Sequence, residues 1–305
     1  METSVLVQKR TQTPRQKLNK AIPYLLVAPV LIYYMLFWLR PVIKSLISSF
    51  TAMEGGFTLQ NYLMVFRDPS FVTALRNTAV ITIFSVTLEF ILALALALII
   101  NRKFKGSGGL LFIALVPMAL PPVAAAAIWQ TGLTSHGWLN SLLTNIGILQ
   151  DGAKFYFLTG SEWQNILLII IIDAWQVIPS VMIILLAGLQ NLPPEAKEAG
   201  LVFGGNKLTV LRRITLPMLK PTITTAVILR LISAIQIWLI LVIMFGFNRL
   251  PVLLERVIYY KEEVPGIQFA DQMAITYTIV VSLIVSITAI IYLQVSGAFG
   301  RKEGR

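Results

Sequence analysis

The segment LPPEAKEAGLVFGGNKLTVLRRITLPMLKP, from Leu192 to Pro221, is the one long, polar and cation-rich stretch between two strongly apolar runs. Pro193 and Pro194 are typical of a helix start, because the first turn of a helix does not need their missing N–H groups. Gly204–Gly205 is expected to break that helix. The segment therefore predicts one or two short helices rather than a slack linker.

A second helix stop is predicted at Pro217, after the basic pair Arg212 and Arg213. Glu195 and Glu198 fall in the first turns of the first helix, where acidic residues are favoured. A helical hairpin of this kind, placed between two membrane spans on the cytoplasmic side, is expected to act as a docking element. That expectation requires both flanking runs to be membrane spans.

The composition is that of a membrane protein. The 305 residues are 56% hydrophobic and 13% charged, with a mean hydropathy of +0.77, whereas soluble proteins carry about 25% charged residues. Apolar runs of about 20 residues recur, long enough for a helix to cross a ~30 Å hydrocarbon core. They lack the alternation of barrel strands, and six are predicted to be transmembrane helices: Ile22–Leu39, Thr78–Ile100, Leu110–Trp129, Ile166–Leu189, Thr222–Phe245 and Met273–Leu293.

The net charge of +11 reports topology rather than nucleic-acid binding. With the first 20 residues inside, sixteen of the 25 basic residues lie on inside segments, eight lie on outside segments, and Arg230 lies within a span. This positive-inside bias predicts that both termini are cytoplasmic. The sixteen inside residues are Lys9, Arg10, Arg15, Lys17, Lys20, Arg102, Lys103, Lys105, Lys197, Lys207, Arg212, Arg213, Lys220, Arg301, Lys302 and Arg305.

The chain has no cysteine, which excludes disulfides and thiol chemistry. Its single histidine, His136, falls in an outside loop and is expected to be a surface residue rather than a metal ligand. The first apolar run is too long for a signal-peptide core, and no small-residue cleavage site closes it. We therefore expect an uncleaved signal-anchor span.

Three ionisable residues lie within predicted spans, where each costs about 2.5–3.5 kcal/mol or more if it faces lipid. At 1.5 Å per residue, Glu89 lies about 16 Å below the outer end of its span and Arg230 about 12 Å above the inner end of its own. These depths favour a Glu89–Arg230 pair, either as a structural ion pair or as part of a central cavity. Asp173, about 10 Å below the outer end, is expected to be too shallow to be the better partner and to serve as a packing or gate residue.

The third predicted span contains Pro117, Pro121 and Pro122, which remove backbone hydrogen bonds at membrane depth. Such breaks are tolerated where neighbouring helices or a water-lined cavity satisfy the freed groups. The candidate substrate pathway therefore combines the intramembrane ionisable residues with two polar or aromatic neighbours: Glu89, Asp173, Trp175, Arg230 and Gln236.

No catalytic site or metal site is predicted. The glycine-rich run GLVFGGNKLT lacks the spacing and the Lys-Ser/Thr pair of a phosphate-binding loop. The sequence contains no metal-ligand cluster and no nucleophile elbow. If ATP drives transport, the ATPase is expected to be another chain.

The opening segment resembles a known loop. Glu198-Ala199-Gly200, then Gly204, nine residues, and Ile214-x-Leu216-Pro217 is similar to E-A-A-x-x-x-G-x(9)-I-x-L-P, which marks the membrane subunits of binding-protein-dependent ABC importers. The resemblance covers most of the chain, and stretches such as VPMALPPVAAAAIW and DAWQVIPSVMIILLAGLQNLP look like the sugar-importer branch, of maltose and trehalose type.

The resemblance implies a coupling helix that sits in a cleft of the ATPase, with a glutamate that meets a cation there. The positions that inherit this coupling role are Glu195, Glu198, Ala199, Gly200, Phe203, Gly204, Leu216 and Pro217. Two of them depart from the family pattern: Gly200 replaces the second alanine, and Phe203 replaces the aspartate before the glycine. The apolar flank Leu201–Phe203 is consistent with close packing against a partner.

A larger departure follows the fifth span, where FGFNRLPVLLERVIYYKEEVPG replaces the expected glycine-rich TGGGP-like stretch. Segment 246–272 is expected to face outside, near where the family binds its substrate-delivery protein. This difference has little effect on the predicted coupling role. It leaves open which sugar is transported.

The resemblance implies an all-α membrane protein with six transmembrane helices and the type I ABC importer permease fold. We expect a cytoplasmic tail at 1–20, the first span with an external segment at 21–72, a five-span core at 73–295 that contains the coupling loop 190–221, and a second tail at 296–305. The implied function is the permease subunit of a sugar importer in the cell membrane. The expected partners are a second homologous permease, two ATPase subunits that bind ATP and Mg²⁺, an extracytoplasmic sugar-binding protein and membrane lipid.

Two other function classes remain open from the residues. The same scaffold serves permeases for polyamines, phosphate or amino acids, although scarce charge within the spans favours a neutral solute. An ion-coupled secondary transporter would need a coupling-ion site and an ion gradient instead of ATP. A polytopic membrane enzyme is a distant third, because no reactive cluster is present.

Overall fold

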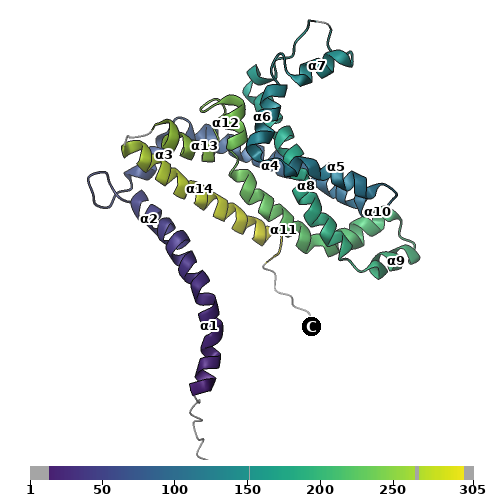
Figure 1. Cartoon of the computed structure of the whole chain (residues 1–305), viewed down its shortest axis with the longest axis horizontal. Coiled ribbons are helices and arrows are strands. Elements are labelled where there is room, and N and C mark those ends of the chain that lie inside the picture. Colours follow the sequence, from purple (N-terminus) through teal and green to yellow (C-terminus); the bar gives the residue numbers. More distant parts are fainter. Residues whose placement is uncertain (1–13, 151, 265–267, 299–305) are drawn as a thin grey trace, which may run out of the picture. The chain divides into compact units, whose positions relative to one another are not determined.

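The structure, a computed structural model, describes residues 14–150, 152–264 and 268–298. Regular elements in these ranges are helical, apart from one isolated β-bridge between Thr51 and Phe57. The outer parts of the predicted tails, 1–13 and 299–305, lie outside the described residues. The chain divides after Thr58 into two compact units, each considered by itself (Figure 1).

The first unit contains one long apolar helix, formed by α1 (Pro14–Tyr34), the π-helical turn η1 (Met35–Leu39) and α2 (Arg40–Ser49). The predicted span Ile22–Leu39 lies within this helix, which runs on past Arg40-Pro41 to Ser49. The π-turn lets the Arg40 N–H bond to the Met35 carbonyl, five residues back. Pro41 then falls in the first turn of α2, where its missing N–H is tolerated.

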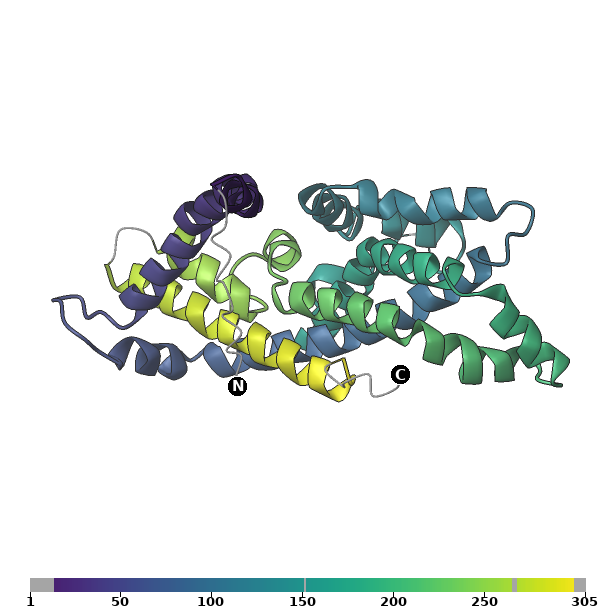
Figure 2. The same ribbon diagram turned by 90° about the horizontal axis from the view of Figure 1, so that it is seen from below.

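The second unit is built on α4 (Phe71–Ile100) and α8 (Glu162–Gln190), which pack along each other. The alanines Ala93 and Ala97 of α4 are fully buried against Leu185 and Leu189 of α8. Small residues at these positions let the two backbones approach closely, which is how helices associate in lipid. Around this pair lie α5 (Ser107–Ala119), α11 (Leu216–Ile235) and α14 (Gln268–Val295) (Figures 1 and 2).

Five helices of the described chain are long and apolar enough to cross a membrane, or six if one bent pair is counted as a span. The bent pair is α5 with α6 (Pro122–Gly132), which meet at 93°. The predicted span Leu110–Trp129 is thus broken at two of the prolines that were expected to interrupt it, Pro121 and Pro122. Pro121 and Pro122 together remove two N–H donors, and Leu120 and Pro121 take extended conformations between the helices.

The predicted fifth span, Thr222–Phe245, is also interrupted. Helix α11 ends at Ile235, residues 236–238 are not helical, and α12 (Leu239–Phe245) follows in a new direction. Helix α12 packs against α6, with Ile240, Leu241 and Met244 in the same buried cluster as Ala126. The two broken segments therefore pack against each other.

The remaining elements are short and connect or cap the long helices. They are α3 (Gln60–Arg67), α7 (Trp138–Asn145), η2 (Phe157–Thr159), α9 (Pro194–Val202), α10 (Lys207–Val210), η3 (Leu211–Thr215), α13 (Leu253–Ile258) and η4 (Tyr259–Glu263). In Figure 1, α9 and α10 lie at the opposite end of the second unit from α3 and α13.

Segment 246–264 is a packed element rather than a solvated loop. Arg256 of α13 is buried and donates to Asp68, which follows α3, at 3.2 Å. The same carboxylate oxygen accepts hydrogen bonds from the hydroxyls of Tyr277 (2.6 Å) and Tyr260 (3.0 Å). Nothing in the sequence pattern pointed to this cluster, because its members come from three separate segments.

Replacing Asp68 with asparagine is expected to lower the unfolding free energy by about 1–3 kcal/mol at neutral pH, because buried Arg256 loses its anionic partner. Burial alone would raise the pKa of Asp68, but hydrogen bonds from Tyr277 and the Ser70 N–H and the attraction of Arg256 outweigh it and hold this pKa below its usual value. The contribution of ionised Asp68 is therefore fully present above the pKa of an unfolded aspartate, about 3.9, and is lost as pH falls through the folded pKa.

The measurement is thermal unfolding of wild type and Asp68→Asn in detergent, from neutral pH down to about pH 3. The difference between the two proteins is expected to shrink toward acid. A difference that stays constant over this range would contradict the role of the ionised carboxylate.

Candidate functional site

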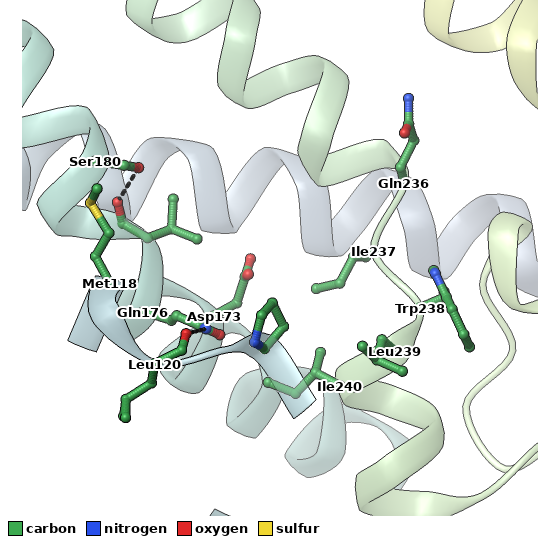
Figure 3. Close-up of a pocket in the computed structure, with 12 residues that line it drawn as sticks. Met118, Leu120, Asp173, Gln176, Ser180, Gln236, Ile237, Trp238, Leu239 and Ile240 are labelled. Carbon is green, nitrogen blue, oxygen red and sulfur yellow. Dashed lines mark hydrogen bonds between the residues drawn. The ribbon is translucent and has the colours of Figure 1, made fainter. Parts of the chain in front are cut away.

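A cavity of about 420 Å³ lies where the two broken segments face α8. Its polar lining comes from Asp173, Gln176 and Ser180 of α8 and from Gln236 and Trp238 at the break after α11. Figure 3 shows Asp173 and Gln176 close to Leu120, while the side chain of Gln236 points away from the other labelled residues. The cavity lining is therefore mostly apolar, and three of its five residues with polar groups lie on α8.

Gln176 explains how a broken helix is tolerated beside the cavity. Its Nε2 donates to the carbonyl of Leu120 at 3.2 Å, next to the Pro121–Pro122 break. On the other side, Nε2 of Gln130 in α6 donates to the carbonyl of Ile243 in α12. Backbone groups freed at membrane depth need such partners, so these two glutamines satisfy carbonyls on the broken segments.

A buried charge cluster joins three helices next to this cavity. Arg230 of α11 donates to both carboxylate oxygens of Glu89 in α4, through Nε and through Nη2, the latter at 2.9 Å. Its Nη2 also donates to Oδ2 of Asp173 in α8, and its Nη1 donates to Ser233 at 3.1 Å. Glu89 is 0% exposed, Arg230 7% and Asp173 9%.

The predicted Glu89–Arg230 pair is confirmed, and Glu89 makes two hydrogen bonds to Arg230. Asp173, expected to be too shallow to be the better partner, makes one, so its depth does not keep it from Arg230. Helix α8 begins at Glu162, four residues before the apolar run that served as its outer end. This places Asp173 about 16 Å along the helix instead of about 10 Å. The first turn of α8 is therefore helical although its residues are polar and gave no hydropathy signal for a span.

The candidate pathway residues separate into two groups. Asp173 and Gln236 line the cavity, whereas Glu89 and Arg230 lie behind Asp173 and do not line it. Trp175 does not line it either, and its ring packs edge-on against Trp129 with centroids 5.5 Å apart.

Sequence reasoning missed three polar or aromatic residues that line the cavity. Gln176 and Ser180 follow Asp173 by three and seven residues, so helical periodicity puts all three on one face and could have found them. Trp238 carries no such signal, because it lies in a break that no proline or glycine marks.

The second candidate site is the predicted coupling loop 190–221, and helix α9 is its exposed part. It begins at Pro194 and ends in a hydrogen-bonded C-cap, in which Gly205 N–H bonds to the Gly200 carbonyl and Gly204 N–H to the Leu201 carbonyl, both at 3.0 Å. Gly204 has φ +82°, a left-handed conformation that side chains disfavour. The predicted start and the predicted break are both confirmed.

The predicted second stop at Pro217 is wrong. A helical run continues from Lys207 through the π-turn of η3 to Ile235, and Pro217 lies in the first turn of α11. A proline near the start of a helical segment costs only its own N–H, and the π-turn relaxes the ladder before it. The loop is therefore joined to the cavity edge by one continuous helical rod.

The end of α9 presents an apolar surface. Val202 is 84% exposed and Phe203 90%, and Leu201 is also exposed. Glu195, Glu198, Ala199, Gly204 and Pro217 are exposed as well, and Leu216 is half-buried.

Gly200 is half-buried and marks a close contact within the chain. A Cβ atom placed there would clash with Ile214 Cδ1 and lie 3.1 Å from Val210 Cγ2. At this position, where the family pattern has alanine, the glycine has no side chain, and α9 can pack closely on the helical run that begins at Lys207. Most of the other predicted coupling positions are exposed, which is how a docking surface would be arranged.

Replacing Gly204 with valine is expected to displace the end of α9, because a β-branched residue resists φ near +82°. Nothing lies within 4 Å of a Cβ at this position, so the effect is purely one of backbone conformation. Gly204→Asn is the matched control, since asparagine tolerates the left-handed region. Protease sensitivity of the loop should rise in Gly204→Val and stay near wild type in Gly204→Asn; equal sensitivity in both variants would contradict this explanation.

Residues 89–299 match the family described as "Binding-protein-dependent transport system inner membrane component". The chain is 33% identical over 242 residues to the trehalose/maltose transport system permease protein MalF of Thermococcus litoralis, covering 77% of this chain and 80% of that protein.

Solved structures share the fold. A bacterial ABC transporter for import of the acidic polysaccharide alginate aligns with a TM-score of 0.81 at 20% identity, over 94% of this chain and 99% of that chain. The alginate transporter in complex with a pentasaccharide-bound periplasmic protein aligns with a TM-score of 0.77 at 20% identity, over 95% and 98%.

Proposed function

This chain belongs to the family of inner-membrane components of binding-protein-dependent transport systems, and from that membership we propose that it forms the path of a neutral sugar through an ABC importer. The observation that carries the proposal is the cavity of about 420 Å³ between the two broken segments. This volume lies within the ~300–1,000 Å³ range of small-molecule sites. A disaccharide or a short oligosaccharide is the solute class that we favour.

The lining suits a sugar. Gln176, Ser180 and Asp173 can exchange hydrogen bonds with hydroxyl groups. Trp238 supplies an aromatic ring, and the aliphatic remainder can cover the C–H faces of a pyranose. Polyamine or phosphate would need several fixed charges of one sign, which the described lining lacks.

The transporter is proposed to contain a second permease of the same family, two ATPase subunits that bind ATP and Mg²⁺, and an external binding protein. Both termini are proposed to be cytoplasmic, an orientation that the distribution of basic residues favours. The exposed end of α9, with Val202 and Phe203, would then dock on an ATPase subunit, and Glu198 would meet a cation there. ATP hydrolysis belongs to those subunits, and this chain supplies the path.

The helical rod from Lys207 to Ile235 suggests how the two sites communicate. Helix α9 packs near the Lys207 end of the rod. The Ile235 end is followed by Gln236, which lines the cavity. A displacement of α9 by closing ATPase subunits would move the rod and change access to the cavity. The coupling would be a population shift driven by the differential affinity of the ATPases for the two states.

The test is uptake by the complete transporter in liposomes, with radiolabelled maltose or trehalose loaded on the binding protein. We expect uptake with ATP inside and none with an ion gradient alone. Uptake that follows an ion gradient without ATP would support an ion-coupled transporter instead. Absence of uptake for both sugars, with ATP-driven uptake of an amino acid or phosphate, would reassign the solute class.

A further inference from the structure

The charge cluster contributes one ionisable group to the cavity. Among the described residues that line it, Asp173 alone is ionisable. Its partners Glu89 and Arg230 lie behind it, on α4 and α11, and are buried. A solute in the cavity would therefore meet this carboxylate and not the arginine.

Arg230 has little capacity left for a solute. A guanidinium has five N–H donors, and the contacts to Glu89, Asp173 and Ser233 use four of them. The side chain is 7% exposed. An anion could bind this arginine only by displacing a carboxylate that already holds it.

The cluster carries no net positive charge as long as at least one of its two carboxylates is ionised. With Glu89 and Asp173 both ionised, the three side chains sum to −1; with one proton bound, they sum to zero. Like charges at close range repel strongly where the effective dielectric constant is low. An acidic sugar placed against ionised Asp173 would therefore meet repulsion without a compensating cation from this chain.

The Arg230 contact uses Oδ2 of Asp173 and orients the carboxylate. Carboxylates accept charge-assisted hydrogen bonds, which are roughly twice as strong as those between neutral groups. We infer that Asp173 is a specificity-determining residue of this transporter, which accepts hydrogen bonds from the hydroxyls of a neutral sugar and rejects carboxylated or sulfonated sugars. This inference rests on the proposed function and names the charge class that its cavity selects.

The experiment measures solute binding in the cavity directly, because the binding protein also selects solutes. The chain has no cysteine, so Met118→Cys places a single thiol of this chain on the cavity wall. The complete transporter is reconstituted without binding protein, and alkylation of this chain by a maleimide is followed by mass spectrometry. The two probes are maltose and maltose with one hydroxymethyl group oxidised to a carboxylate.

Maltose is expected to slow alkylation at concentrations at least about tenfold lower than its carboxylate derivative. With Asp173→Asn added, protection by maltose should weaken severalfold, and the two probes should become nearly equal. Asp173→Glu keeps the charge and is expected to retain the discrimination. Equal protection by both probes with Asp173 intact would overturn the inference.

Glu89→Gln is the matched control, because it removes one carboxylate from the same cluster but does not line the cavity. It should leave the preference for maltose in place if Asp173 acts by contact. If both variants lose the preference equally, the effect comes from the cluster as a whole, and the assignment to Asp173 fails.

The inference and the proposed function fail in different ways. If maltose enters liposomes with ATP but never protects the thiol, the sugar path stands and the assignment of Asp173 is wrong. If no sugar is taken up and neither probe protects, the proposed function fails together with the inference. Thermal unfolding of each variant separates these outcomes from misfolding, and Asp173→Glu supplies the second test if Asp173→Asn does not fold.

Discussion

Arg230→Met is expected to lower the unfolding free energy by about 3–5 kcal/mol, because it leaves Glu89 and Asp173 buried side by side without their shared cation. No other single substitution considered for this chain removes the partner of two buried charges. Thermal unfolding of the detergent-purified transporter, with the amount of protein inserted in the membrane, measures the effect. Sugar uptake should fall with the amount of folded protein.

The control for Arg230→Met is the neutral triple variant, in which Glu89→Gln and Asp173→Asn accompany it. Uncharged side chains of similar size remove the free-energy cost of burying charged groups, so much of the lost stability should return. Glu89→Gln alone should cost less than Arg230→Met, because Arg230 keeps Asp173. If Arg230→Met unfolds at the wild-type temperature, the cluster does not stabilise the helix packing.

Glu198→Arg is expected to reduce ATP-driven uptake by at least about tenfold while the protein stays folded in the membrane. Glu198 is exposed on α9, so its replacement should leave the isolated chain intact. Reversal of charge at a docked site places like charges together, which costs several kcal/mol. ATP hydrolysis stimulated by the loaded binding protein, measured beside uptake, reports the loss of coupling.

Glu198→Asp keeps the charge and serves as the matched control, with uptake expected to remain within a few-fold of wild type. Phe203→Lys tests the apolar part of the same surface, since Phe203 is 90% exposed and a charge there would oppose burial against a partner. Both damaging variants should unfold at the wild-type temperature. Normal stimulation of ATP hydrolysis in Glu198→Arg would remove α9 from the proposed interface.

Much of the architecture was predictable because its causes are local. Runs of about 20 apolar residues predicted the long helices, since bilayer thickness sets that length. Pro193-Pro194 and Gly204-Gly205 predicted the ends of α9, because missing N–H groups and a positive φ act within one turn. The Glu89–Arg230 pair was predictable because a charge within the apolar layer needs a partner nearby.

Other features depended on how the helices pack. Asp173 joined Arg230 because α8 extends beyond its apolar run, and because three helices converge there. The break after Ile235 has no proline or glycine, and the packing of α12 on α6 accompanies it. The contact between Asp68 and Arg256 joins residues 188 positions apart, and no local pattern encodes such a distance.

Local sequence patterns are enough to show that this chain is a helical membrane protein, where most of its spans lie, and where the exposed helix α9 begins and ends. These properties follow from hydropathy and from backbone restrictions that act over one turn or one span. Three features become visible only in the folded chain: two carboxylates share Arg230, one of them lines a cavity, and a continuous helical run extends from the α9 contact to the edge of that cavity. The physical reason is that pairing, cavity shape and mechanical connection depend on the mutual packing of helices that are distant in sequence.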